Sequence, residues 1–352
     1  MGELSDNLER ADWIHERLDL ERKLHAAHSR VGELRRLHRE LHRKLDISEQ
    51  DLALVLDVAR NDKPVAPIRP RDRRRSEAAA VLLLSDVHIG ETVDPDTVNG
   101  SNEYTPEIAE QRLEQFFRSA AEWVIELRAH QKVDHLILWL GGDVITGYES
   151  APELQETNTL GPCQEVVFGR RHFRRGIAFL LDALDPKRLT IPCSMGNHGR
   201  ITDKLRFSTM KRTSLEHILY QVLAGDFRED KRVQFLIPDG FTTYLDVFDT
   251  TCRFMHGDTL SGGASGAALY GGLIRAMAKQ DRDRRAQLTC IGHFHRYLHV
   301  QDGGRHGIVN GSVVGPSAYS TRFGGYDLAS QVGVLIDSKA GVVYSRPLEV
   351  RV

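Results

Sequence analysis

The segment Val81-Leu82-Leu83-Leu84-Ser85-Asp86-Val87-His88-Ile89-Gly90 joins an apolar run to a sudden change in polarity. An uninterrupted apolar run of this kind is typical of a strand that is buried on both faces of a sheet. Asp86 and His88 follow directly, so two side chains that can bind a metal lie at the carboxyl end of the predicted strand. Ligands of open α/β sheets bind at that end. We therefore expect the functional site there.

Later segments repeat this design of a strand-like run followed by polar residues and glycine or a turn. Each cluster alone is weak evidence, because a single Gly-Asp or a histidine after a strand is usually a turn or a structural residue. Together, the five clusters supply two aspartates, one asparagine and five histidines. The clusters are Asp86-Val87-His88, Gly142-Asp143, Gly196-Asn197-His198, His256-Gly257 and Gly292-His293-Phe294-His295.

The order of the predicted elements indicates the fold class. Amphipathic helices are predicted at 105–127, 165–184 and 213–223, each after one of the strands that end near the first three clusters. The chain after about residue 250 has short strand-like runs and few helices. An order of βαβα followed by mostly β predicts an α/β (α+β) fold in which two sheets form a β-sandwich flanked by helices.

An N-terminal helical extension, residues 1–62, precedes this domain. Its narrow apolar stripe has two possible structural interpretations. One is an antiparallel helical hairpin, in which Ser48 and Asp51 form a capping box for a second helix. The other, which we prefer, is a coiled coil with a second copy, because the spacing is mostly that of positions a and d of a heptad, with His38 as a polar interruption. The stripe consists of Leu20, Leu24, Ala27, Val31, Leu34, Leu41 and Leu45.

Residues 63–77 form a predicted linker between the helical region and a domain at 78–352. Pro64, Pro67 and Pro70 stand among five arginines there, a composition that cannot sustain a helix or be buried. A basic run of this kind can touch phosphates, but a solvated linker is the commoner explanation.

Composition excludes several classes of protein. The 352 residues are 41% apolar and 27% charged, with a net charge of -2, so no global field attracts nucleic acid or an anionic membrane. No stretch approaches the roughly 20 apolar residues that cross a bilayer. The four cysteines stand apart and no apolar signal segment opens the chain. We expect a cytoplasmic protein with free, mostly buried thiols and no membrane partner.

The residue types of the clusters fit a transition-metal site. Imidazole and carboxylate together suit zinc, iron and manganese, whereas magnesium and calcium sites are nearly all oxygen. Seven ligand candidates are too many for one tetrahedral site, but they suffice for two ions if one carboxylate bridges. Two ions can stabilise the attacking and leaving oxygens of a displacement at phosphorus. The sequence has no nucleophile elbow, P-loop or dinucleotide fingerprint.

In order and spacing, the five clusters resemble the five blocks of the calcineurin-like metallophosphoesterase superfamily, over residues of about 80 to 320. The resemblance implies two divalent ions, with manganese favoured over iron or zinc, and a hydroxide between them as nucleophile. By the resemblance His198 would stabilise or protonate the leaving oxygen. One ion would be held by Asp86, His88, Asp143 and His295, and the other by Asp143, Asn197, His256 and His293.

One position departs from the family pattern. The family often has an acidic residue after the Asn-His pair, and Gly199-Arg200 follows here. Arg200 is equally well interpreted as a bidentate phosphate contact or as a surface residue at a turn. The blocks at 141–147, 196–200 and 309–312 look most like those of phage and bacterial phosphoesterases or repair exonucleases.

Three functions follow as hypotheses. The first is a metal-dependent phosphodiesterase or nuclease, with nucleic acid the favoured substrate. The alternative is a phosphomonoesterase that acts on a phosphoprotein or a nucleotide. The third is a non-catalytic scaffold, which we rank last because such a protein would be expected to have lost ligands and none is lost here. For partners, the sequence predicts a phosphate-ester substrate and a homodimer or higher assembly formed through the N-terminal helix.

Overall fold

The computed structural model describes residues 2–60, 76–150, 153–260, 266–322 and 325–352. In the first of these ranges, side chains are described for residues 13–53 and 56. The chain divides into two units, residues 1–73 and 74–352. The predicted linker at 63–77 lies outside the described residues, apart from Ser76 and Glu77.

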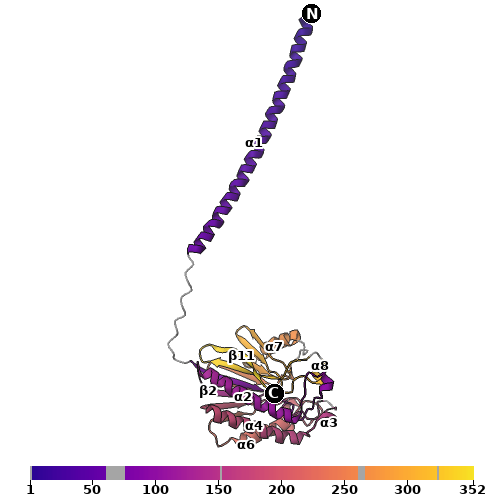
Figure 1. The fold of residues 1–352 in the computed structure, drawn as a ribbon, viewed down its shortest axis with the longest axis vertical. Helices are drawn as coiled ribbons and strands as arrows, with labels where there is room; N and C mark the ends of the chain where they lie inside the picture. The colour runs from indigo at the N-terminus through magenta and orange to yellow at the C-terminus, as the bar shows by residue number, and fades with distance from the viewer. Residues whose placement is uncertain (1, 61–75, 151–152, 261–265, 323–324) are drawn as a thin grey trace. The chain divides into compact units, whose positions relative to one another are not determined.

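The first unit contains one continuous helix, α1 (Gly2–Arg60), of 59 residues (Figure 1). The hairpin alternative is therefore wrong for the residues up to Arg60. Ser48 and Asp51 lie inside the helix and start no second one, because good helix formers without glycine or proline flank them on both sides. The coiled coil stays a prediction at this point.

The second unit contains two sheets, and the larger one is organised around the strand β1. Its strand order is β11-β10-β1-β2-β3-β4. The strands β1, β2, β3 and β4 are parallel, so their carboxyl ends meet at one edge, while β10 is antiparallel to β1 and β11 is antiparallel to β10. The strands are β1 (Glu77–Leu84), β2 (Lys132–Leu140), β3 (Arg188–Pro192), β4 (Val233–Leu236), β10 (Ser330–Asp337) and β11 (Gly341–Glu349).

The smaller sheet has the strand order β5-β6-β7-β9-β8. Its middle strands β6, β7 and β9 are parallel to one another, so their carboxyl ends also share one edge. The edge strands β5 and β8 are antiparallel to their neighbours. The strands are β5 (Thr242–Val247), β6 (Thr250–Met255), β7 (Leu288–Ile291), β8 (Leu298–Asp302) and β9 (Arg305–Val309).

Helices cover the outer faces of both sheets, as Figure 1 shows. Apolar residues of α2, α4 and α6 share one core cluster with the outer face of the larger sheet. Residues of α7 pack on the outer face of the smaller sheet. The long helices are α2 (Pro106–Arg128), α4 (Pro162–Leu184), α6 (Leu215–Asp226) and α7 (Gly266–Gln280), and the short ones are η1 (Pro95–Val98), α3 (Leu154–Thr157), η2 (Phe207–Thr209), α5 (Met210–Thr213) and α8 (Ala318–Arg322).

Alternate residues of β1 divide the core into two layers. Leu82 and Leu84 face the helices, whereas Val81 and Leu83 face the smaller sheet. Because successive side chains of a strand point to opposite faces, a strand that is apolar throughout must be covered on both. Between the sheets, the rings of Trp139 and Phe254 lie 5.9 Å apart. The predicted sandwich of two sheets flanked by helices is confirmed.

The cysteines also match the expectation from the sequence. Cys193, Cys252 and Cys290 are buried and Cys163 is exposed, and all four are free thiols. Among the described helices, none has the length and apolar character that a membrane span requires.

Candidate metal centre

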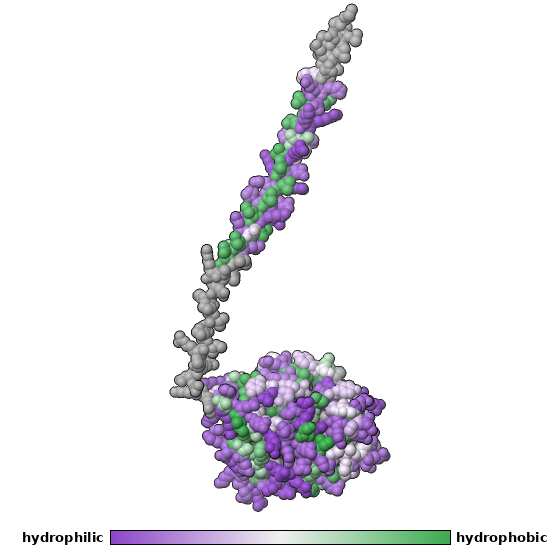
Figure 2. Space-filling model, in the orientation of Figure 1, coloured by the Kyte–Doolittle hydropathy of each residue, from purple (hydrophilic) through white to green (hydrophobic). Residues whose placement is uncertain are grey.

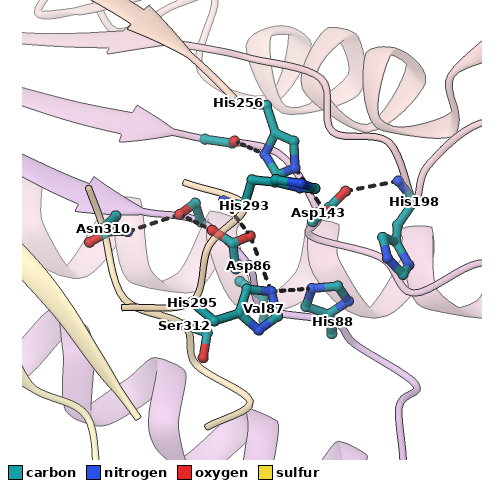
Figure 3. A network of polar contacts seen from close by, with 12 residues as sticks. Asp86, Val87, His88, Asp143, His198, His256, His293, His295, Asn310 and Ser312 are labelled. Carbon is teal, nitrogen blue, oxygen red and sulfur yellow. Dashed lines mark hydrogen bonds and ion pairs between the residues drawn. The ribbon is translucent and has the colours of Figure 1, made fainter. Parts of the chain in front are cut away.

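Loops that follow five strands bring the predicted site residues to one edge of the two sheets (Figure 3). Every residue that was predicted to bind a metal lies in this group, and His198 lies beside it. Asp86 and His88 follow β1, Asp143 follows β2, Asn197 and His198 follow β3, His256 follows β6, and His293 and His295 follow β7.

Backbone hydrogen bonds fix these loops against one another. The amide of Asp86 donates to the carbonyl of Gly142 over 3.0 Å, and the amide of His88 donates to that of Asp143 over 3.0 Å. From the smaller sheet, the amide of His293 donates to Asp86 Oδ1 over 2.9 Å. The loop after β7 is thereby tied to the aspartate after β1, although 207 residues separate them.

Five of the site residues have a left-handed backbone conformation without being glycine. This conformation is costly for residues with a Cβ atom and concentrates at functional sites. It turns each side chain sharply out of its strand and toward the shared edge. The φ angles are 52° at Asp86, 53° at His88, 48° at Asp143, 70° at His293 and 55° at His295.

A first cluster consists of Asp86, His88 and His295, whose ligand atoms all lie within 4.8 Å of one another. The Nε2 atoms of His88 and His295 are 3.1 Å apart. His295 Nε2 is also 3.4 Å from Asp86 Oδ1. Two imidazole nitrogens and a carboxylate oxygen therefore converge on one point.

A second cluster consists of Asp143, His256 and His293, again with ligand atoms within 4.8 Å of one another. His256 Nε2 lies 2.9 Å from Asp143 Oδ2 and 3.2 Å from Asn197 Oδ1. The amide oxygen of Asn197 thus joins two imidazoles and a carboxylate.

Asp143 connects the two clusters. Its carboxylate also lies within 4.8 Å of ring nitrogens of His88 and His198, so it is in reach of members of both clusters. Two ligand clusters that share one aspartate, at the edge of a two-sheet sandwich, are what the sequence resemblance implied.

Comparison with solved structures gives several proteins of low sequence identity. An archaeal phosphodiesterase is 11% identical, with a TM-score of 0.34, over 76% of this chain and 99% of that chain. A Streptococcus pneumoniae protein described as a predicted phosphoesterase is 14% identical, with a TM-score of 0.30, over 77% and 97%. Wild-type Vps29 of Entamoeba histolytica, complexed with zinc, is 12% identical, with a TM-score of 0.31, over 77% and 99%. No family model and no curated protein matches the sequence. At these identities the likeness concerns the fold alone.

Hydrogen bonds set the orientation of two imidazole rings in the site. His256 Nδ1 donates to the carbonyl of Gly141 over 2.8 Å, which leaves Nε2 facing Asp143 and Asn197. His198 Nδ1 donates to the carbonyl of Thr146 over 2.8 Å, which leaves its Nε2 for another group. A carbonyl that holds one ring nitrogen in this way is a common support of metal-binding histidines.

Burial and the neighbouring carboxylates set the protonation states in the site. Burial opposes the charge of His256 and His295, but Asp143 and Asp86 raise the pKa of these two rings. Burial and the neighbouring rings of His198 and His295 hold the pKa of His88 well below its usual range. Burial and His256 lower the pKa of His293 to about 4. Burial opposes the charge of Asp143, but His256 and His198 hold the pKa of that carboxyl well below its usual range. His88 and His293 are thus neutral and Asp143 is charged near neutral pH, and these are the forms that bind metals.

The donor set fits divalent transition metals. The two clusters offer imidazole nitrogens, carboxylate oxygens and one amide oxygen, the mixture that suits zinc, iron or manganese. His88 Nε2 faces the first cluster, whereas its buried Nδ1 atom lies 3.7 Å from Glu91 Oε2.

A polar network behind Asp86 aims its carboxylate. Ser85 Oγ donates to Asp86 Oδ2 over 2.5 Å, and Asn310 Nδ2 donates to Ser85 Oγ over 2.9 Å. Asn310 Nδ2 also donates to Gln331 Oε1 over 2.7 Å. Asn310 belongs to the block at 309–312 of the sequence. Its hydrogen bond to Ser85 supports the residue that in turn contacts the Asp86 carboxylate.

Two buried glutamates that the sequence analysis missed hold the ligand loops. Glu216 of α6 accepts hydrogen bonds from the amides of Val144 and Gly196, both over 2.6 Å. Glu165 of α4 accepts from the amides of Thr146 (2.7 Å) and Gly147 (3.1 Å). Burial raises the pKa of Glu216 to about 7, with the charge of Asp143 adding to it, and raises that of Glu165 to about 8. Both braces tie helices to the loop that carries Asp143.

Two more carboxylates lie close to the clusters. Glu91 Oε2 is 3.7 Å from His88 Nδ1. Asp258 follows His256 by two residues, and its Oδ2 atom is buried without a hydrogen-bond partner among the described residues. Burial raises the pKa of both carboxyls. The only feature of the sequence that could have identified Glu91 and Asp258 as site residues was their position within three residues of a cluster.

Arg200 is occupied by its own loop. Its guanidinium donates to the carbonyl of Thr202 and to Ser150 Oγ, each over 3.0 Å, and also to the carbonyls of Asn197 and Glu149. These contacts brace the loop that carries Asn197. A contact between Arg200 and phosphate stays a prediction that these bonds do not support.

The Glu216 brace gives a testable prediction. In Glu216→Gln the side-chain oxygen can accept a hydrogen bond from only one of the two backbone amides, Val144 or Gly196. The side-chain NH₂ group then faces the other amide, so two donors oppose each other. We expect unfolding to become easier by about 1–3 kcal/mol and metal affinity to fall by about 10–100-fold. Thermal denaturation and metal titration at pH 8 measure both, with the exposed Glu122→Gln of α2 as control. An unchanged metal affinity in Glu216→Gln would contradict the role given to this brace.

Proposed function

We propose that this chain is a metal-dependent phosphoesterase that hydrolyses phosphodiesters, with nucleic acid as the favoured substrate class. The observation that carries the proposal is the pair of ligand clusters that share Asp143. His198, whose Nδ1 atom donates to the Thr146 carbonyl, lies beside them and supports it further. All the ligand residues that the family pattern requires are present, which favours catalysis over a role as a scaffold.

Seven residues would hold two divalent ions. When bound, the ions would activate water and offset negative charge on the phosphate. Manganese is the first choice, and iron or zinc would suit the same donors. Asp86, His88, His295 and Asp143 would hold one ion, and Asp143, Asn197, His256 and His293 the other.

His198 would assist the departure of the alcohol. Its Nδ1 atom already donates to the Thr146 carbonyl, so the imidazolium form carries its second proton on Nε2. That proton would pass to the leaving oxygen as the ester bond breaks, the role of a general acid. The backbone amide of His198 donates to Asp143 Oδ1 over 2.8 Å, which ties the position of the acid to the shared carboxylate.

A substrate panel tests the proposal. With manganese, iron, zinc or magnesium added, the purified chain should hydrolyse a bis-aryl phosphate and single-stranded DNA faster than the matching mono-aryl phosphate. Asp143→Asn protein from the same purification shows whether a contaminant contributes. A strong preference for the monoester would favour a phosphatase acting on a phosphoprotein or a nucleotide. Inactivity with every metal would contradict the phosphoesterase itself.

A further inference from the structure

The apolar stripe of α1 is uncovered within its own unit. Leu20 is 62% exposed, and Leu34 and Leu41 are each 64% exposed. Figure 2 shows apolar side chains along the helix among charged ones. Leucines in such numbers on a water-exposed helix indicate that another surface covers them, because a helix is stabilised mainly through packing of its apolar face.

The spacing of the stripe identifies the kind of surface. A period of 3.5 residues over more than four heptads is typical of a helix that packs along another helix, whereas a helix on a globular core shows a broader stripe. All the a and d positions from Leu20 to Leu52 are apolar except His38 and Ser48. Position a falls on Leu24, Val31, His38, Leu45 and Leu52, and position d on Leu20, Ala27, Leu34, Leu41 and Ser48.

The flanking charges disfavour a parallel pair of α1 helices. In a parallel dimer in register, each g residue faces the e residue five positions further along the other helix. Glu16 would then face Glu21, and Arg30 would face Arg35. Both are pairs of like charge, and both would occur twice. Of the charged pairs in that register, only Lys44 with Glu49 joins opposite charges.

We propose that α1 pairs with α1 of a second copy as an antiparallel coiled coil, with His38 opposite Leu41 of the other helix. In an antiparallel pair, a residues meet d residues, and the flanking pairs are g with g and e with e. Arg30 then faces Asp51 of the second copy, and His28 faces Glu49. Two-fold symmetry makes each of these pairs occur twice.

The same register places large side chains well. Leu45 meets Leu34 of the second copy, and Leu52 meets the small Ala27. The single His38 meets a leucine and not another histidine, so no pair of imidazoles is forced together in the core. The same register also places Val31 opposite Ser48 and Arg35 opposite His42, so the two pairs of Arg30 with Asp51 are the ones of opposite full charge that favour it.

The antiparallel arrangement separates the C-terminal ends of the two helices. At a rise of 1.5 Å per residue, this register places these two ends about 60 Å apart.

Light scattering on the full-length chain tests the dimer. We expect a mass of twice 39.7 kDa for the wild type and of one chain for Leu34→Glu/Leu41→Glu. The control is Leu18→Glu/Ile47→Glu, which changes two apolar residues of the same helix that lie outside positions a and d; it should remain dimeric. Circular dichroism confirms that α1 is still helical in each variant.

Three results would overturn the dimer. They are a monomeric wild type, a stripe variant that keeps twice the mass, and a control that dissociates as readily as the stripe variant. A helix that packs on its own catalytic domain, or on a different protein, would give the first of these. Because mass is measured without substrate, a failure of the proposed phosphoesterase activity leaves this test intact.

Cysteine cross-linking decides the direction. In a Cys163→Ser background, the antiparallel register places residue 34 beside residue 45 of the second copy, while each lies about 16 Å along the axis from its own equivalent. Mild oxidation should therefore link Leu34→Cys/Leu45→Cys into covalent dimers and leave each single variant unlinked. In a parallel pair both single variants would link to themselves, and that result would overturn the proposed direction.

Discussion

The Asp143→Asn variant is expected to lose metal from both positions at once and to turn over no phosphate ester. Asp143 is a member of the second cluster, and its carboxylate is also within 4.8 Å of a ring nitrogen of His88 in the first. An amide in its place is neutral and offers one oxygen where the carboxylate offers two. Because a divalent ion depends on that charge, we expect the affinity at each position to fall by more than about 100-fold.

Elemental analysis after dialysis measures this loss directly. Asp185→Asn is a matched control, since Asp185 has a similar left-handed backbone (φ 40°) at the end of α4 but belongs to neither cluster. The control should keep wild-type metal and turnover. An Asp143→Asn protein that retained two ions and full activity would show that the clusters are not joined through this residue.

The His198→Ala variant is expected to lose about 10²–10⁴-fold in turnover while its metal content stays near that of the wild type. His198 Nδ1 donates to the Thr146 carbonyl, so this nitrogen is not available to bind an ion. The other ring nitrogen, Nε2, can deliver a proton to the leaving group. The loss should be greatest for substrates with a poorly acidic leaving alcohol and smallest for nitrophenyl esters, which need little help from an acid.

His293→Ala gives the contrast that makes this result decisive. His293 lies in the second cluster, so its loss should remove metal and activity together. If His198→Ala also lost metal, or if its turnover fell equally for all leaving groups, then His198 would be a ligand or a structural residue and not the acid.

The ligands could be predicted from the sequence because each follows a strand closely. The apolar run Val81–Leu84 identifies a buried strand, and the polar residues after it must then lie at the edge of the sheet. The same short-range logic places Asp143 after β2 and His256 after β6. Parallel strands bring these ends together, so the metal centre follows from local patterns and one rule of topology.

The braces behind the ligands could not be predicted in this way. Glu216 lies 72 residues from Val144, and its only signal was an acidic residue on the apolar face of a helix. Such a residue can equally be a surface charge at the edge of the stripe. The single helix α1 was also missed in part, because Ser48 and Asp51 have the composition of a helix start, and only the flanking helix formers decide against it.

The left-handed backbone at Asp86, His88, Asp143, His293 and His295 makes this site vulnerable to protein engineering. Each such residue with a Cβ atom costs about 1 kcal/mol, which glycine would avoid. Directed evolution scored on heat resistance alone would therefore reward glycine at the very positions that hold the ligands. Selection for thermal stability favours glycine at these five positions, whereas selection for catalysis favours the ligand residues. A library of variants of this protein must therefore be scored on turnover from the first round.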